Sequence, residues 1–506
     1  MCTFLRVWTV TLILVTGGCA FVEPVPAGPN KLDQSSENKK AASASYLMTV
    51  NSALALADTD DEARAVTKLT KVISDPMFHE LPAQKRYATL SLAGSMALRN
   101  QQFEHALGFL LMATELNAGN AIDWFQLSLV EVALGNGDQA AEYFSKLARE
   151  WPEVANQVSD EVFHLVKAGT EDNSTARFEL LQSLFDARWH PNRAIASNLW
   201  YELALMQMAR NDLDSVAEIV PNISTPSDLV KLASDNRFNS ISVVKNLDID
   251  TAASNHLAAL RVLSDESPNN LEITLELFDA LLTAGRHQEV LDISDAWIAR
   301  LALPTSDAPP IQGIQFQVWV ANKRVTALRR LNRTEEAVAQ LIAASKDQEN
   351  GHRNVSQILN LGDLYVSLGQ PDDAIAAVKE VGEMSGYGQM VLKSVTHAAF
   401  RQKGDLDNAE SALSYIRQYK KDAPIILVEA LVEANKMDEA AKYLIEMLNS
   451  PDDRGVALLW LQIFRERPSL PGTIQWDARC KVLRSREDVI DAVKTVGQIK
   501  TYEIFG

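Results

Sequence analysis

The sequence predicts an all-α protein built from successive pairs of amphipathic helices. Apolar residues recur every three or four positions, as at Leu90, Ala93 and Ala97 and again at Leu107 and Leu110. Short polar turns separate these periodic segments, and runs that alternate like strands are almost absent. The whole pattern also recurs along the chain, which is typical of repeat architectures. We therefore expect a helical repeat protein.

Composition indicates a soluble folded body and excludes some partners. Apolar residues make up 47% and charged residues 23% of the chain, and the net charge is −18. An acidic chain lacks the basic stripe that neutralises phosphates, so we expect no nucleic-acid partner. Of the three cysteines, Cys2 and Cys19 lie in the first segment, which leaves no disulfide framework. Cys480 is predicted to be a small buried apolar residue.

Residues 1–18 are predicted to be a secretory signal peptide. Arg6 precedes a short apolar run at residues 10–15, too short to span a bilayer as a helix, and Thr16, Gly17 and Gly18 lead up to Cys19. Small residues before a cysteine resemble the lipobox of bacterial lipoproteins. That resemblance implies cleavage before Cys19 and attachment of a lipid, including palmitate, to its thiol.

Two details bear on the destination of the chain. Thr16 stands where lipoproteins more often have leucine, so ordinary cleavage near Cys19 and a soluble periplasmic or secreted protein remain the alternative. Ala20 is not the aspartate typical of lipoproteins retained at the inner membrane, so the resemblance implies the outer membrane, periplasmic side. Residues 19–45, rich in proline at the start and polar afterwards, are predicted to be a flexible tether.

One segment resembles the tetratricopeptide repeat. It departs from the family pattern at Ser128 and Glu131 and keeps the remaining signature residues, which are Trp124, Leu127, Ala140, Phe144 and Pro152. Further matches begin at Trp200 and Ile358. In all three, a first-helix residue precedes a small second-helix residue by sixteen positions, the pairs being Trp124 and Ala140, Trp200 and Val216, and Ile358 and Ala374.

The small second-helix residue lets two antiparallel helices approach closely. Following this anchor along the chain gives about ten helix pairs, at Ala106, Ala140, Ala176, Val216, His256, Val290, Ala337, Ala374, Ala409 and Ala440. His256 fits the pattern least well. The resemblance implies an α-solenoid wound as a right-handed superhelix.

We expect two arrays and a terminal element. Asp235, Arg237 and Phe238 resemble the segment that closes runs of such repeats, so the arrays are predicted at residues 46–250 and 251–475. Residues 476–506 are predicted to be a cap or a docking tail without a second pairing helix. A cap is favoured because terminal repeats must cover an apolar face.

The sequence carries no recognisable catalytic, phosphate-binding or dinucleotide-binding motif, so we predict no enzyme activity, no cofactor and no metal. The acidic pair Asp248 and Asp250 lacks the glycine and distal glutamate of a calcium loop. We predict that it caps a helix instead.

The resemblance places a partner-binding face on first-helix residues that point away from the helix seam. The seven predicted face residues are Phe125, Tyr201, Trp319, Asn322, Thr326, Arg329 and Asp363, with Leu129, Leu205 and Leu359 beside them. The alternative is that the aromatic members pack between repeats. Trp319, Asn322 and Arg329 combine an aromatic anchor with polar groups, as interaction hot spots do.

These observations predict a non-enzymatic scaffold of the bacterial cell envelope. Its concave repeat surface would bind other envelope proteins, and the lipid on Cys19 would anchor it to the membrane. The alternative is a glycan-cleaving envelope enzyme, or a regulator of one, which would need an acid of raised pKa beside a second carboxylate.

Overall fold

The predicted polar turns separate helices throughout the described chain. The computed structural model describes residues 34–56, 62–189, 196–302, 310–349 and 352–506. The predicted signal peptide, Cys19 and the first part of the tether lie outside these residues. The chain forms two compact units, Met1–Arg210 and Asn211–Gly506. The predicted boundary between residues 250 and 251 therefore lies inside the second unit. The predicted arrays (residues 46–250 and 251–475) and the predicted terminal element (residues 476–506) do not coincide with the two units.

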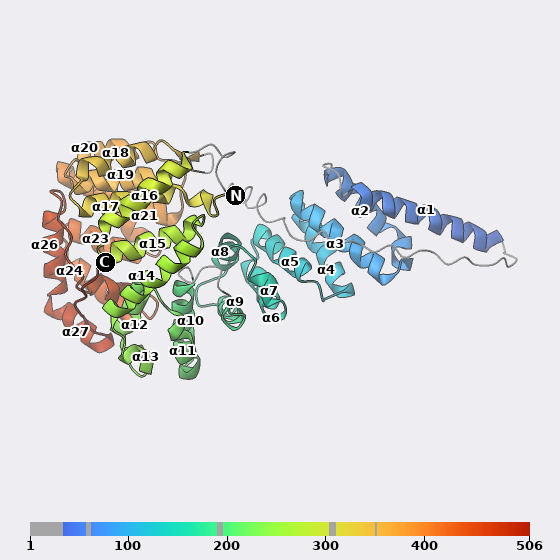
Figure 1. Ribbon diagram of the computed structural model, residues 1–506, viewed down its shortest axis with the longest axis horizontal. Coiled ribbons are helices and arrows are strands. Elements are labelled where there is room, and N and C mark those ends of the chain that lie inside the picture. Colours follow the sequence, from blue (N-terminus) through green and yellow to red (C-terminus); the bar gives the residue numbers. More distant parts are fainter. Residues whose placement is uncertain (1–33, 57–61, 190–195, 303–309, 350–351) are drawn as a thin grey trace. The chain divides into compact units, whose positions relative to one another are not determined.

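The N-terminal unit is a run of antiparallel helices (Figure 1). Its helices are α1 (Gln34–Leu56), α2 (Glu62–Ser74), η3 (Pro76–Glu80), α3 (Ala83–Arg99), α4 (Phe103–Leu116), α5 (Ala121–Leu134), α6 (Gly137–Glu150), α7 (Pro152–Ala155), α8 (Asp160–Ala168), α9 (Thr175–Asp186) and α10 (Ser197–Ala209). One hydrophobic cluster joins α1 to α5.

Helix α1 corrects the predicted tether. It begins at Gln34, so residues 34–45 are helical rather than flexible. Alanine, lysine and glutamate are good helix formers, and several occur between residues 37 and 44. Further along the helix, Tyr46, Val50 and Ala53 are buried in the hydrophobic cluster, which holds α1 against the unit.

The C-terminal unit continues the helix pairs. Its helices are α11 (Leu213–Ile219), η4 (Val220–Asn222), α12 (Pro226–Ser234), η5 (Asn236–Phe238), α13 (Ser242–Lys245), α14 (Ile249–Glu266), α15 (Leu271–Thr283), α16 (His287–Leu301), η6 (Ile314–Phe316), α17 (Val318–Arg330), α18 (Thr334–Ala344), α19 (Val355–Ser367), α20 (Pro371–Val378), α21 (Gly386–Lys403), α22 (Leu406–Gln418), α23 (Pro424–Glu433), α24 (Met437–Asn449), α25 (Arg454–Leu461), α26 (Ile474–Arg484) and α27 (Glu487–Val496).

A short hairpin interrupts the helices of this unit. Strands β1 (Gln348–Glu349) and β2 (His352–Arg353) pair antiparallel between α18 and α19. Asp248 is the N-cap of α14, and its carboxylate accepts hydrogen bonds from the backbone N–H groups of Asp250 and Thr251, as predicted. Within the described segments, no helix is both long enough and apolar enough to cross a membrane.

The helix seams confirm the predicted all-α solenoid of tetratricopeptide-like pairs. Eight of the ten predicted anchors are at most 1% exposed, and they are Ala106, Ala140, Val216, Val290, Ala337, Ala374, Ala409 and Ala440. Ala176 and His256 are wrong as anchors, because both are partly exposed. Beside them Arg177 in α9 and Leu257 in α14 are buried instead.

The first helix of several pairs carries a distinctive residue twelve positions before the anchor. At Gly362 an added Cβ would lie 2.6 Å from Val378 Cγ1, so the seam with Ala374 closes only around glycine. Ser128, a departure from the family pattern, donates from its hydroxyl to the Ala140 carbonyl at 2.9 Å. The other departure, Glu131, is 4% exposed and accepts a hydrogen bond from Asn136. Both departures are thus satisfied inside the seam.

The end of the chain contains a second pairing helix, contrary to the prediction for residues 476–506. Helix α27 packs on α24 and follows α26 as the second member of a pair. Its residues Val489 and Val493 are buried in the same hydrophobic cluster as Cys480, which is 2% exposed as predicted. Burial raises the pKa of the Cys480 thiol to about 12.

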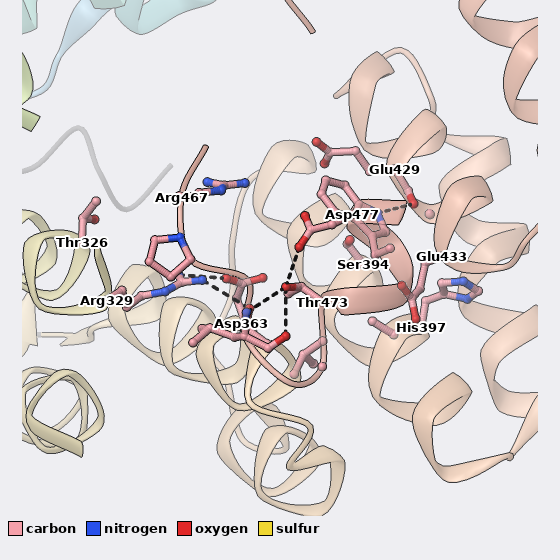
Figure 2. A pocket seen from close by; sticks show the side chains of 18 of the residues that line it. Thr326, Arg329, Asp363, Ser394, His397, Glu429, Glu433, Arg467, Thr473 and Asp477 are labelled. Atoms are coloured by element: carbon pink, nitrogen blue, oxygen red, sulfur yellow. Dashed lines mark hydrogen bonds and ion pairs between the residues drawn. The ribbon is translucent and has the colours of Figure 1, made fainter. Parts of the chain in front are cut away.

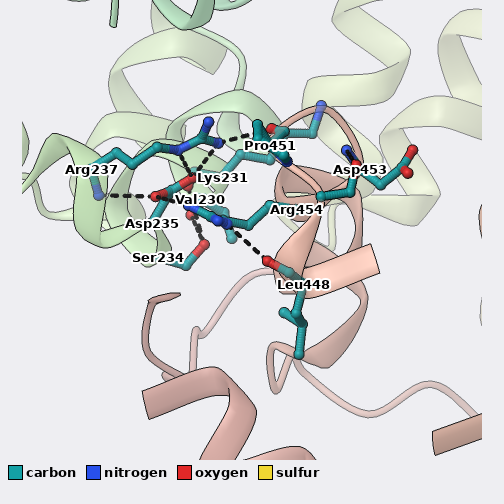
Figure 3. Close-up of polar contacts among 10 residues, drawn as sticks. Val230, Lys231, Ser234, Asp235, Arg237, Leu448, Pro451, Asp453 and Arg454 are labelled. Atoms are coloured by element: carbon teal, nitrogen blue, oxygen red, sulfur yellow. Dashed lines mark hydrogen bonds and ion pairs between the residues drawn. The ribbon is translucent and has the colours of Figure 1, made fainter. Parts of the chain in front are cut away.

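The C-terminal unit closes on itself. Helix α12 packs against α25, and Gln498 donates from its backbone N–H to the Ser234 carbonyl at 2.9 Å. Figure 3 shows the polar contacts at this closure: Asp235 lies beside Arg237, whose guanidinium also donates to the Pro451 carbonyl at 3.1 Å. Arg454 approaches Asp235 at 3.9 Å. The predicted closing segment thus joins the beginning of this unit to its end.

Candidate binding pocket

A cavity of about 380 Å³ lies among the first helices of successive pairs in the C-terminal unit. Helices α17, α19, α21 and α23 each contribute residues three or four positions apart, which places them on one face of each helix. The helical contributions are Thr326, Arg329 and Arg330; Asp363, Val366 and Ser367; Ser394, His397 and Ala398; and Glu429, Ala430 and Glu433. Trp476 and Asp477 of α26 complete the helical part.

The rest of the wall is an extended segment, residues 462–473, which we call the inner segment. Its Gly472 donates from the backbone N–H to the Ser367 carbonyl at 2.8 Å. A Cβ at Gly472 would lie 2.1 Å from the Val366 carbonyl oxygen, so only glycine permits this approach. The inner segment brings Arg467, Pro468 and Leu470 to the cavity.

The inner segment is held from its other side by residues 497–506, the tail segment. Ile463 donates to the Lys500 carbonyl at 3.0 Å, and Tyr502 donates back to the Ile463 carbonyl at 2.8 Å. The ring of Phe505 lies 5.0 Å from that of His287 and within about 6 Å of the Arg330 and Arg465 guanidinium carbons. The tail segment thereby supports one wall of the cavity.

Arginines form one end of the cavity, which we call the arginine end (Arg329, Arg330 and Arg467). Arg329 lies 3.7 Å from the Asp363 carboxylate and donates to the Ser367 hydroxyl at 3.3 Å. Arg330 donates to the Leu282 carbonyl at 2.7 Å. Burial, with the neighbouring positive charges of Arg467 and Arg329, lowers the pKa of Arg330 to about 10. Within the described chain, Arg467 makes no hydrogen bond or ion pair.

Glutamates of α23 form the other end, which we call the acidic end (Glu429 and Glu433). Burial raises the pKa of Glu429 to about 7, and a hydrogen bond from the Trp460 side chain opposes this in part. Burial also raises the pKa of Glu433. In Figure 2, Arg329 and Arg467 lie on one side of the cavity and Glu429, Glu433 and His397 on the other.

Three further polar residues of the cavity, Thr473, Asp477 and His397, are neutral or already paired. The Thr473 hydroxyl donates to the Asp477 carboxylate at 3.0 Å. His397, 1% exposed, donates from Nδ1 to the Ala409 carbonyl at 2.8 Å, and burial lowers its pKa, so it stays neutral near pH 7. Among the described residues, no group of three or more His, Cys, Asp or Glu side chains could hold a metal ion.

Three of the seven predicted face residues line this cavity: Thr326, Arg329 and Asp363. Asn322 lies one turn away and accepts a hydrogen bond from Asn360 at 3.3 Å. Trp319 is partly buried and does not line the cavity. In the N-terminal unit, Phe125 is partly buried and Tyr201 is 8% exposed. Tyr201 therefore packs among the helices, which agrees with the alternative that the aromatic residues pack between repeats.

Sequence reasoning missed the acidic end and the inner segment. Glu429 sits at the predicted first-helix spacing, eleven residues before the anchor Ala440, and could have been found by carrying the pattern into that pair. Arg467 and Gly472 lie outside the repeat pattern. Only the prolines at residues 468 and 471 signalled an irregular segment there.

Comparison with known proteins finds similarity only to solved structures, in the arrangement of the backbone. No family model and no curated protein matches the chain. Similar solved structures include Naa15/Naa10 bound to HypK-THB (13% identity, TM-score 0.24, covering 89% of this chain and 80% of that one) and yeast Tom70 (10%, 0.32, 89% and 98%). Another is the APC/C hetero-tetramer Cut9-Hcn1 (14%, 0.36, 90% and 83%). At these identities and TM-scores, the likeness says nothing about a ligand.

Proposed function

We propose that this protein is a non-enzymatic scaffold that binds protein partners through the cavity face of its C-terminal unit. The observation that supports this most directly is the convergence of four successive first helices on one cavity lined by polar side chains. Arginine and acidic groups beside apolar lining residues give a partner both orientation and buried contact area.

Site-specific photo-crosslinking tests this proposal. A photoreactive residue at position 326 should crosslink a protein from envelope extracts, and Arg329→Ala should reduce that crosslink severalfold. A photoreactive residue at Lys442, which is exposed and outside the cavity, is the matched control. Equal crosslinking at positions 326 and 442, or no effect of Arg329→Ala, would contradict the proposal.

We further propose that the scaffold is a lipoprotein of the outer membrane, facing the periplasm. Support comes from the sequence alone, through the apolar run, the small residues before Cys19 and Ala20 after it. Labelled palmitate should enter the protein in cells and should not enter a Cys19→Ser variant. A variant that still incorporates the label would overturn the lipid attachment.

A second candidate function is a glycan-cleaving enzyme, or a regulator of one. The observation that favours it is Glu429, whose pKa of about 7 suits a general acid, in a cavity that also contains Asp363 and Asp477. Purified protein would then release reducing ends from peptidoglycan or envelope polysaccharide. Glu429→Gln would abolish that release, whereas a scaffold shows none with either protein.

A further inference from the structure

The cavity is polarised along its length, and the two ends are chemically unequal. The arginine end holds three guanidinium groups, and the acidic end holds two carboxyl groups on α23. A cavity with positively charged groups at one end and carboxyl groups at the other is complementary to a ligand that carries one negative and one positive charge.

The arginine end has more positive charge than its surroundings neutralise. Among the described residues, the one carboxylate within ion-pair distance of these guanidinium groups is that of Asp363, which lies 3.7 Å from Arg329. Arg467 has no such partner in the described chain and is exposed. An anionic group placed among these guanidinium groups would relieve their mutual repulsion and accept several charge-assisted hydrogen bonds.

The acidic end carries partly buried carboxyl groups, which a cationic group would stabilise in their charged form. Glu429 and Glu433 are one helical turn apart on α23, and both are only partly exposed. The cations that act on Glu433 are Arg479 and Arg401, neither of which lines the cavity. Arg467 and Arg484 act on Glu429, but burial outweighs them and its pKa stays raised. An ammonium group at this end would supply the charge that desolvated carboxylates lack.

We infer that the cavity binds a small dipolar molecule, of the class of short peptides with free ends, whose carboxylate lies at the arginine end and whose ammonium group lies at the acidic end. The apolar residues that also line the cavity, Val366, Ala398, Ala430 and Leu470, fit aliphatic side chains rather than further charge. This inference rests on the proposed binding function and specifies the ligand of the same site.

Calorimetric titration of the purified protein with four matched peptides tests the inference. The peptides are trialanine, N-acetyl-trialanine, trialanine amide and N-acetyl-trialanine amide, which differ only in the charges at their ends. Trialanine should bind at pH 8. Each single cap should weaken binding about tenfold or more, because each removes a charge-assisted hydrogen bond.

Two substitutions identify the two ends separately. Arg467→Ala should weaken the binding of trialanine, which has a free carboxylate. It should leave the binding of trialanine amide, which has none, unchanged. Glu429→Gln should weaken only peptides with a free amino group. Arg467 makes no hydrogen bond with described residues, so its removal leaves the fold intact, and Lys442→Ala is the matched control.

The pH dependence gives an independent readout. Because the pKa of Glu429 is about 7, its carboxylate is lost as the pH falls from 8 to 6. Trialanine should therefore bind severalfold more weakly at pH 6, although its own amino group, with an ordinary pKa of about 7.7–8.0, is more fully charged there. In Glu429→Gln the loss should disappear, and the change in charge of the peptide's amino group is the pH effect that remains. Equal affinity for all four peptides, or no binding of trialanine at millimolar concentration, would overturn the inference. In that case a crosslink at position 326 would show that the proposed scaffold function still stands.

Discussion

Residues of three different kinds occupy one equivalent position, twelve residues before the anchor of their helix pair. Gly94 and Gly362 leave room for the second helix, whereas Ser128 and His397 fill the place and hydrogen-bond to the anchor carbonyl. The family pattern predicts a small residue here. It does not predict a histidine, because the polar solution depends on a carbonyl that only the folded seam supplies.

Gly362→Ala should destabilise the C-terminal unit by about 1–3 kcal/mol, because the new methyl group meets the Val378 and Val395 side chains at 2.6 and 3.0 Å. Gly108 is the matched control. It is exposed in α4 with no atom within 4 Å of an added Cβ, so Gly108→Ala should stabilise by about 0.5–1 kcal/mol. Urea unfolding of the two variants measures both effects, and a loss of stability in both would contradict the seam argument.

Glu429 predicts a pH-dependent stability difference. Its folded pKa of about 7 lies above its ordinary value of 4.5, so its contribution is favourable below about pH 4.5 and is lost as the pH rises through 7. Glu429→Gln should therefore be more stable than the natural protein at pH 8, by about 1–3 kcal/mol, and nearly equal at pH 4.5. Unfolding midpoints at the two pH values measure this. The same difference at both would exclude burial of the carboxylate as its cause.

At the scale of elements, α12 and η5 connect to α25 through one buried carboxylate. Asp235 is 0% exposed, and its oxygens accept from the Arg237 backbone N–H and guanidinium at 2.7–2.9 Å. The sequence analysis singled out this segment as the end of a first array, whereas it lies near the beginning of the C-terminal unit. Its partner in the closure of that unit was not predictable, because α25 lies more than 200 residues further along the chain.

Arg237→Ala should destabilise the C-terminal unit by about 3–5 kcal/mol, because it leaves the buried Asp235 carboxylate with Arg454 at 3.9 Å as its nearest cation. Lys494→Ala removes an exposed ion pair with Asp491 and serves as the control. It should leave the unfolding midpoint unchanged. Comparable midpoints for the two variants would show that the closure carries little of the stability.

At the scale of the whole molecule, the division into two units predicts where such damage spreads. In Arg237→Ala, amide hydrogen exchange should accelerate over residues 211–302, 310–349 and 352–506 and remain unchanged over residues 62–189. Mass spectrometry of the exchanged peptides measures this. Faster exchange in α3 to α6 would show that the two units unfold as one.

The sequence predicted those parts of the fold that local spacing determines. Anchors such as Ala140 and Ala374 follow from periodicity, and so does the placement of Thr326, Arg329 and Asp363 on first helices. The inner segment and the tail segment have no period of their own. Their positions depend on contacts such as Gly472 to Ser367 and Phe505 to Thr283, which form only once the helices are in place.

The closure of the C-terminal unit also has a consequence for the order of events during synthesis. Repeat arrays ordinarily gain stability pair by pair as they emerge, since each pair contacts only its neighbours. Here α12 obtains part of its packing from α25, and the Gln498 side chain donates to the Ala233 carbonyl across 265 residues. At about 5–20 residues per second, roughly 13 to 50 seconds of translation separate these two partners. During that interval α12 lacks its final neighbour, so a factor that recognises its uncovered apolar side would bind during synthesis, before the closure forms.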